Sequence, residues 1–185
     1  MSCDLSAGRL INCRDISGGI QAVYLIDFGD MGAVTVTSDE VTDMAGTFNA
    51  YKYDVKGAGN SLEQAITASS DNGTVFFEQT LSLNLPKLSK EDMVQFKLLS
   101  YGRPHCIIVD NNGNALLAGK EFGLTVSGGS ITTGAAMGDM SGTTLTLTGQ
   151  EKLPANFISG ATVANPFAGL PTASTSATIV VGTNS

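Results

Sequence analysis

The side chains best suited to nucleophilic or metal chemistry are one histidine and three cysteines. The only histidine, His105, is followed directly by Cys106, and the other thiols belong to Cys3 and Cys13. A cysteine nucleophile needs a base within hydrogen-bonding reach, but neighbouring strand residues point to opposite faces, so His105 is not placed to activate Cys106. The four residues also lack the short paired spacings of structural zinc sites. The pattern favours a structural histidine beside a buried cysteine, and we predict no metal and no other cofactor.

Two polar segments resemble ligand-binding loops without matching them. In residues 113–120 the glycine spacing is one residue longer than in a P-loop, and Glu121 stands where Ser or Thr would bind magnesium. Residues 110–114 offer oxygen ligands for calcium, but the glycine is misplaced for an EF-hand and no glutamate closes the loop. A tight hairpin turn explains residues 110–114 more simply.

Two carboxylates, Glu63 and Glu78, are expected on one face of a single hairpin. A pair of hydrolytic carboxylates would need a cleft with aromatic side chains that stack on the substrate, whereas the expected neighbours are Ser, Thr and Ala. We therefore expect solvated carboxylates. With the other candidates set aside, the sequence predicts that the protein is not an enzyme.

The element that carries both carboxylates is a long β-hairpin over residues 60–85. Asn72-Gly73 is a preferred centre for a type I′ turn, and centring the hairpin there pairs Glu63 with Ser82. One face is then mainly apolar and the other small and polar, and a slip of one residue would mix them. The expected packing face holds Leu62, Ile66, Phe77, Leu81 and Leu83, and the expected polar face holds Glu63, Ala65, Thr67, Glu78, Thr80 and Ser82.

The whole chain is predicted to be mainly β, a β-sandwich or small barrel with one flanking α-helix and the long hairpin protruding. The helix is expected to begin after Ser89, with Asp92 at its third position, and to end at Gly102 before Pro104. The other expected strands cover residues 20–28, 33–37, 50–55, 105–109, 115–118, 124–126, 131–133 and 144–148. Gly128-Gly129 is expected to form a tight turn between two of them.

The domain organisation predicted is one domain over residues 1–158 and a C-terminal extension over residues 159–185. The chain carries no charged side chain after Lys152 and is rich there in Ala, Thr, Gly and Ser. A free tail usually keeps charges for solvation, so the β-prone residues 177–181 could dock on a neighbouring subunit by strand addition. A flexible low-complexity end is the alternative interpretation.

The composition limits the possible partners and location. The sequence has 185 residues and a formal net charge of −7, which argues against a protein that grips nucleic-acid phosphates. An acidic wall would instead let DNA pass without adhering. The N-terminus lacks the features of a signal peptide, and no apolar run is long enough to span a membrane. The odd number of cysteines predicts reduced thiols, so we expect a soluble protein made in a cytoplasm, with no membrane partner.

The order of these elements over residues 11–158 resembles a bacteriophage tail tube (major tail) protein. The likeness lies in the long hairpin, the capped helix after it and the Ile-Ile-Val-Asp-Asn-Asn-Gly-Asn-Ala-Leu-Leu-Ala-Gly segment from Ile107. It continues in residues 142–151 and the following Leu-Pro-Ala-Asn-Phe-Ile segment. The resemblance implies a virion structural protein whose hexameric rings stack into a tube, with the hairpins joined into a β-barrel around a DNA channel.

The resemblance also assigns roles and partners. The polar face of the hairpin would line the lumen and its apolar face would pack outward on the sandwich. The partners would be copies of the same chain, neighbouring tail proteins and transiently passing DNA. The location would be the virion tail, assembled in the cytoplasm of a host bacterium. Residues 33–50 could form a loop that contacts the next ring. Alternatives are a head-to-tail adaptor, a capsid decoration protein, or a subunit of an injection or secretion tube.

Overall fold

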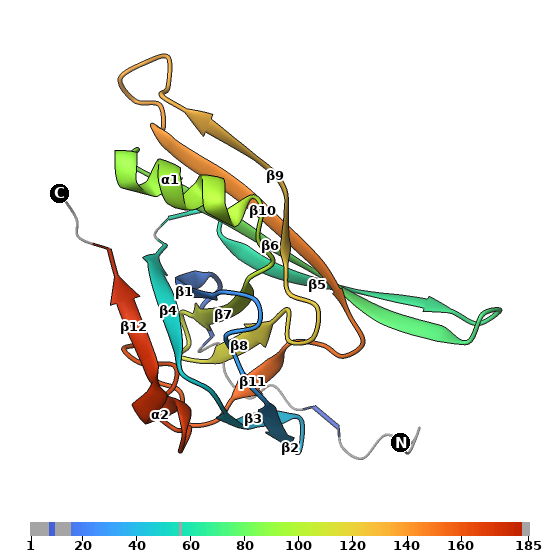
Figure 1. Ribbon diagram of the computed structural model, residues 1–185. Helices are drawn as coiled ribbons and strands as arrows, with labels where there is room; N and C mark the ends of the chain where they lie inside the picture. Colours follow the sequence, from blue (N-terminus) through green and yellow to red (C-terminus); the bar gives the residue numbers. More distant parts are fainter. Residues whose placement is uncertain (1–7, 10–15, 56, 183–185) are drawn as a thin grey trace.

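The computed structural model describes residues 8–9, 16–55 and 57–182, which form two β-sheets and two short helices (Figure 1). The chain is therefore mainly β with a flanking helix, as predicted. The larger sheet contains, in spatial order, β12 (Ala177–Val181), β4 (Phe48–Asp54), β1 (Ile20–Ile26), β7 (His105–Asp110), β8 (Ala115–Ala118), β11 (Asn156–Ile158), β3 (Glu40–Met44) and β2 (Val34–Thr37). The smaller sheet contains, in spatial order, β5 (Ser61–Ser69), β6 (Thr74–Pro86), β10 (Gly142–Glu151) and β9 (Thr125–Thr132).

Two hydrophobic clusters lie on opposite faces of the eight-stranded sheet. Alternation along β1 sends Tyr24 and Ile26 into one cluster and Val23 and Leu25 into the other. The cluster around Val23 fills the space between the two sheets, where it includes Leu81, Leu83, Leu145 and Leu147 of the smaller sheet. The fold is therefore a sandwich that carries a second core behind its larger sheet.

The second core is closed by the C-terminal segment, which corrects the expected division at residue 159. Phe167, Leu170 and Ala173 are at most 1 % exposed in the cluster around Tyr24. The short helix α2 (Ala173–Ser176) leads into β12, which pairs in parallel with β4 of the same chain. The strand addition expected on a neighbouring subunit is thus made within the chain, because the segment returns across the open face of its own sheet.

A carboxylate holds the residue that precedes α2. The side chain of Asp43 on β3 accepts hydrogen bonds from the backbone N of Thr172, at 2.9 Å, and from its Oγ1, at 2.6 Å. These bonds lower the pKa of the Asp43 carboxyl, since they favour its charged form.

The expectation of a loop over residues 33–50 is wrong, because β2, β3 and the start of β4 occupy these residues.

The hairpin of β5 and β6 forms as predicted but with its register shifted by two residues. Glu63 lies opposite Thr80, not Ser82, and a four-residue turn over residues 70–73 replaces the type I′ turn. Gly73 has a φ of 61°, but Asn72 lacks the positive φ that type I′ needs. The Oγ of Ser69 accepts a hydrogen bond from the backbone N of Asn72 and stabilises the wider turn. A shift of two keeps every side chain on its expected face.

Two further predictions, the start of α1 and the turn at Gly128-Gly129, were made from local sequence signals, and only the first is confirmed. The helix α1 (Lys90–Leu99) begins as predicted, with the Oγ of Ser89 accepting a hydrogen bond from the backbone N of Asp92 at 3.0 Å. The predicted turn at Gly128-Gly129 is wrong, since both glycines lie inside β9. A Cβ on Gly129 would lie 2.5 Å from the backbone O of Thr144, so this glycine permits close approach of β10.

Candidate functional site

The most distinctive surface of the described chain is the polar face of the four-stranded sheet. On β5, the side chains of Glu63, Ala65 and Thr67 are exposed on this face. On β6, Glu78 is exposed beside Ala65, whereas Thr80 and Ser82 are half-buried. The structure thus brings together all six residues predicted for the polar face.

The polar face is wider than the sequence analysis predicted, because β10 and β9 extend it. The residues of β10 that continue it are Thr144, Thr146, Thr148 and Gln150, which lie opposite Asn84, Ser82, Thr80 and Glu78 of β6. Further across, the Oγ of Ser130 on β9 lies 2.9 Å from the Oγ1 of Thr144. The Thr-Leu alternation of residues 144–148 signalled a half-buried strand, but not that this strand lies beside β6.

The opposite face of the hairpin packs on the body only along its base. Leu81 and Leu83 are at most 2 % exposed, and Leu62 packs against them at the edge of the core. Phe77 is half-buried, and Ile66 is 69 % exposed, so the expected packing of Ile66 on the sandwich is wrong. The physical reason is that the ladder between β6 and β10 ends at the pair Phe77–Glu151, beyond which the hairpin projects alone.

Two glutamines that the sequence analysis did not single out, the buried Gln79 and the half-buried Gln64, anchor this packing face. The Oε1 of Gln79, which is 1 % exposed, accepts a hydrogen bond from the backbone N of Gly119 at 2.8 Å. The Oε1 of Gln64 accepts one from the backbone N of Ala155, also at 2.8 Å. These bonds give the hairpin base a fixed position on the body, since a buried amide that lost its partner would destabilise the fold.

The hairpin is acidic and lacks basic side chains. Residues 60–86 contain Glu63, Asp71 and Glu78 and no Lys or Arg, and none occurs on β9 or β10. The ion pairs between described residues, Lys52–Asp54 and Lys152–Glu121, lie outside the polar face. Its carboxylates therefore present a negative surface among hydroxyl, amide and small side chains, with the half-buried Phe76 opposite Thr67 near the tip.

His105 and Cys106 have structural surroundings in the folded chain. The Nδ1 of His105 donates a hydrogen bond to the backbone O of Gly119 at 2.6 Å, and its ring stacks on Phe28. The thiol of Cys106 is fully buried, and this burial raises its pKa, so the reactive thiolate is disfavoured. The two side chains point into different environments, as the strand geometry predicts.

The other candidate ligand sets hold together parts of the chain. The Asp110 carboxylate accepts hydrogen bonds from the backbone and side-chain nitrogens of Asn112 and Asn114. Partial burial raises the pKa of Asp110, but these bonds outweigh it and hold the pKa below its usual value. Residues 110–114 are thus the hairpin turn that was predicted. Within the described ranges, no group of three or more His, Cys, Asp and Glu side chains is arranged to hold a metal ion.

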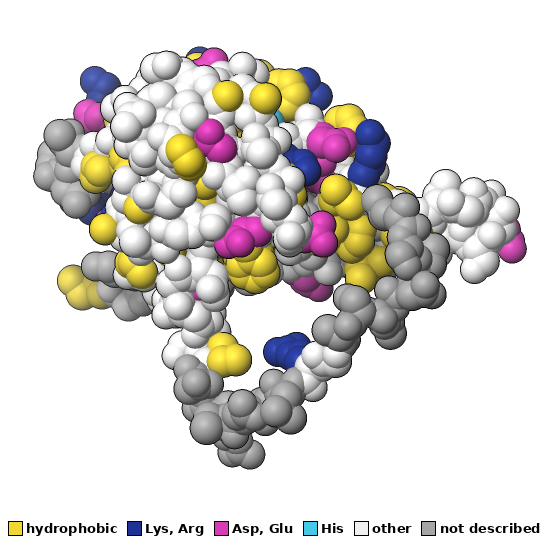
Figure 2. All heavy atoms as spheres, turned by 90° about the horizontal axis from the view of Figure 1, so that it is seen from below, with side chains coloured by type: hydrophobic (Ala, Val, Ile, Leu, Met, Phe, Trp, Pro, Cys, Tyr) yellow, Lys and Arg dark blue, Asp and Glu magenta, His cyan; other side chains and the backbone are white. Residues whose placement is uncertain are grey.

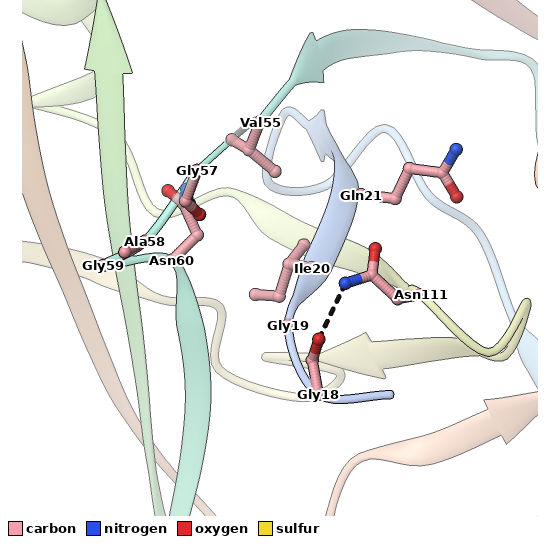
Figure 3. Close-up of a pocket in the computed structure, with 10 residues that line it drawn as sticks. All are labelled: Gly18, Gly19, Ile20, Gln21, Val55, Gly57, Ala58, Gly59, Asn60 and Asn111. Carbon is pink, nitrogen blue, oxygen red and sulfur yellow. Dashed lines mark hydrogen bonds between the residues drawn. The ribbon is translucent and has the colours of Figure 1, made fainter. Parts of the chain in front are cut away.

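A shallow groove of about 650 Å³ lies where the N-terminal segment meets the two sheets (Figure 3). Its described lining includes four glycines and no charged side chain. The Nδ2 of Asn111 spans part of it to reach the backbone O of Gly18 at 2.7 Å. A groove lined in this way offers no acid, base or nucleophile, so the polar face remains the best candidate for function.

Neither helix in the described part of the chain is long and apolar enough to cross a membrane. Comparisons of the chain with protein-family models, with curated proteins and with solved structures found no match.

Proposed function

We propose that this chain is a non-enzymatic structural subunit that assembles with copies of itself into a tube, as the tail tube subunit of a bacteriophage. The polar face of the four-stranded sheet would form the wall of the channel. The observation that carries the proposal is a continuous acidic and hydroxyl-bearing face, bounded on each side by an edge strand that is paired on one side only.

The free edges supply the means of assembly. Among the described strands of one chain, β5 and β9 each have a hydrogen-bonded neighbour on one side only. These strands are nine and eight residues long, and long unpaired edges readily pair with another chain. Pairing β5 of one copy with β9 of the next would continue the sheet, and a closed ring would leave no free edge.

The chemistry of the face suits a channel for DNA. Phosphates are held by Lys and Arg, and the four strands of this sheet contain neither. Carboxylates at Glu63 and Glu78 would repel the polyanion, so DNA would pass without adhering. The partners proposed are therefore other copies, neighbouring tail proteins and passing DNA, in a virion tail assembled in the cytoplasm of a host bacterium.

Electron microscopy of the purified protein over a range of concentrations tests the proposal. Stacked rings with a central channel are the expected result. Single rings that never stack would favour a head-to-tail adaptor, and binding to a capsid lattice would favour a decoration protein. Monomers that persist at millimolar concentration, with or without a tail initiator complex, would contradict the proposal.

Charge reversal on the polar face tests its orientation toward the channel. We expect the double variant Glu63→Lys/Glu78→Lys to fold, since both side chains are exposed, and to form tubes that retain DNA at low salt. The measurement is co-sedimentation of DNA with tubes as the salt concentration is raised, together with phage infectivity. The matched control is Asp27→Lys/Asp30→Lys in the exposed turn after β1, which reverses as many charges away from the sheet. Wild-type infectivity of phage carrying the first pair would count against the orientation.

A further inference from the structure

The hairpin ends in an apolar surface that its own subunit leaves uncovered. We call residues 66–76, which run from the level of the last rung with β10 to the tip of the hairpin and back, the overhang. On its apolar face Ile66 is 69 % exposed, Val75 is 56 % exposed, and Ala68 lies directly opposite Val75 in the ladder. Figure 1 shows the overhang projecting from the body, so the described chain offers nothing near enough to cover it.

A second uncovered apolar surface lies on the helix at the other end of the same sheet. Phe96 anchors α1 in the core between the sheets, but Val94, Leu98 and Tyr101 are 52 %, 61 % and 84 % exposed. Their spacing of four and three residues places them along one side of the helix and its final turn. We call these three residues the helix strip.

The apolar face of the overhang and the helix α1 lie on the same side of the smaller sheet, and the helix strip is on the side of α1 away from the core. By alternation, Ile66, Ala68 and Val75 share the face of Leu81 and Leu83, which pack with Phe96 of α1. The strand β6 has 13 residues, a length of about 40 Å, and α1 begins four residues after β6 ends, opposite the overhang (Figure 1). A copy displaced along the strands would therefore bring the tip of its overhang toward α1 of the copy beyond.

Charge favours the same pairing. The overhang carries Asp71 at its turn, and Figure 2 shows acidic atoms at the end of the projecting arm. The exposed side chains of Lys90 and Lys97 flank the helix strip. Residues 87–103 hold four basic side chains against two acidic ones, whereas the hairpin holds only acidic ones.

We propose that the overhang of one copy docks on the helix strip of a copy in the adjacent ring, a contact that rests on the proposed tube. The surfaces involved are small, and an interface well below about 1,200 Å² is not expected to hold two free subunits together. Repeated around a ring, the same contact gains from multivalency. The overhang would then set the direction of stacking, since each ring offers overhangs at one end and helix strips at the other.

Cysteine crosslinking between two differently sized chains tests the contact. Val75→Cys is placed in a tagged chain and Leu98→Cys in an untagged chain, both with Cys3→Ser and Cys13→Ser, while the buried Cys106 is retained. The chains are mixed under assembly conditions, oxidised and separated without reductant. The matched control replaces Val75→Cys by Thr74→Cys, which is equally near the turn but on the opposite face. We expect about tenfold more mixed dimer with Val75→Cys, because a disulfide forms only when the two Cα atoms lie within about 7 Å.

Electron microscopy of the same mixtures separates this contact from the proposed function. Tubes in which Val75→Cys gives no more mixed dimer than Thr74→Cys would overturn the docking and leave the tube proposal intact. Selective crosslinks without rings or tubes would support the docking of two copies and contradict the tube. If neither selective crosslinks nor rings or tubes are observed, the docking and the tube proposal are both overturned.

Discussion

Deletion of residues 160–185 is expected to unfold the chain itself. The deletion removes Phe167, Leu170 and Ala173 from the core, where the Phe167 ring lies edge-on to Phe48 at 5.5 Å. Truncating a buried Phe or Leu side chain costs about 2–5 kcal/mol, and removing two with the β12 edge approaches the entire stability of a domain, about 5–15 kcal/mol. Circular dichroism and thermal unfolding of the truncated chain measure the loss.

A point variant separates the loss of core packing from the loss of chain length. Phe167→Ala is expected to lower the free energy of unfolding by about 3–5 kcal/mol in urea titrations. Val163→Ala in the same segment, where the side chain is 40 % exposed, should change it by less than about 0.5 kcal/mol. A truncated chain that still melts cooperatively near the full-length temperature would show that the segment is dispensable for folding.

Glu151→Ala is expected to be the most damaging substitution of a charged side chain. Glu151 is 4 % exposed, and its carboxylate accepts hydrogen bonds from the backbone nitrogens of Glu121, at 3.0 Å, and Phe122, at 2.9 Å. Its removal leaves both donors without partners at about 1–3 kcal/mol each, so we expect a loss of about 3 kcal/mol in the free energy of unfolding. Urea unfolding followed by circular dichroism checks the value.

Two companion variants make the test specific. Glu151→Gln keeps one acceptor oxygen and should lose less than Glu151→Ala. Glu121→Ala removes a partly exposed carboxylate that pairs with Lys152 at 3.3 Å, and should cost less than about 1 kcal/mol. Equal stability of Glu121→Ala and Glu151→Ala would show that the buried hydrogen bonds do not stabilise the fold as argued.

Local signals in the sequence were sufficient for some elements. Alternation with a period of two assigns each side chain of the hairpin to a face, and a change of turn that shifts the register by two residues does not alter this assignment. The six polar-face residues were therefore placed together correctly. The cap at Ser89 likewise predicted the start of α1, because the donor and acceptor are three residues apart. The turn itself was wrong, because the Ser69 side chain competes with the backbone preference of Asn72-Gly73.

Signals that depend on distant partners could not be interpreted from one chain. Glycine serves tight turns and close strand approach alike, so Gly129 was assigned to a turn although it lies against β10. The lack of charge after Lys152 indicated that the segment is covered, but not that its own sheet provides the cover. The contribution of β10 and β9 to the polar face was missed for the same reason, since strand order is a long-range property.

The closure of the second core by the C-terminal segment has a consequence for biosynthesis. Asp43 binds Thr172, which is 129 positions later in the chain, and the exposed edge of β4 is completed only by β12. A nascent chain therefore cannot finish its larger sheet until residues 177–181 have been made, and such distant pairings form slowly. Prematurely terminated chains would retain an open core and an unpaired strand. The fold thereby distinguishes chains that include β12 from chains that stop before it.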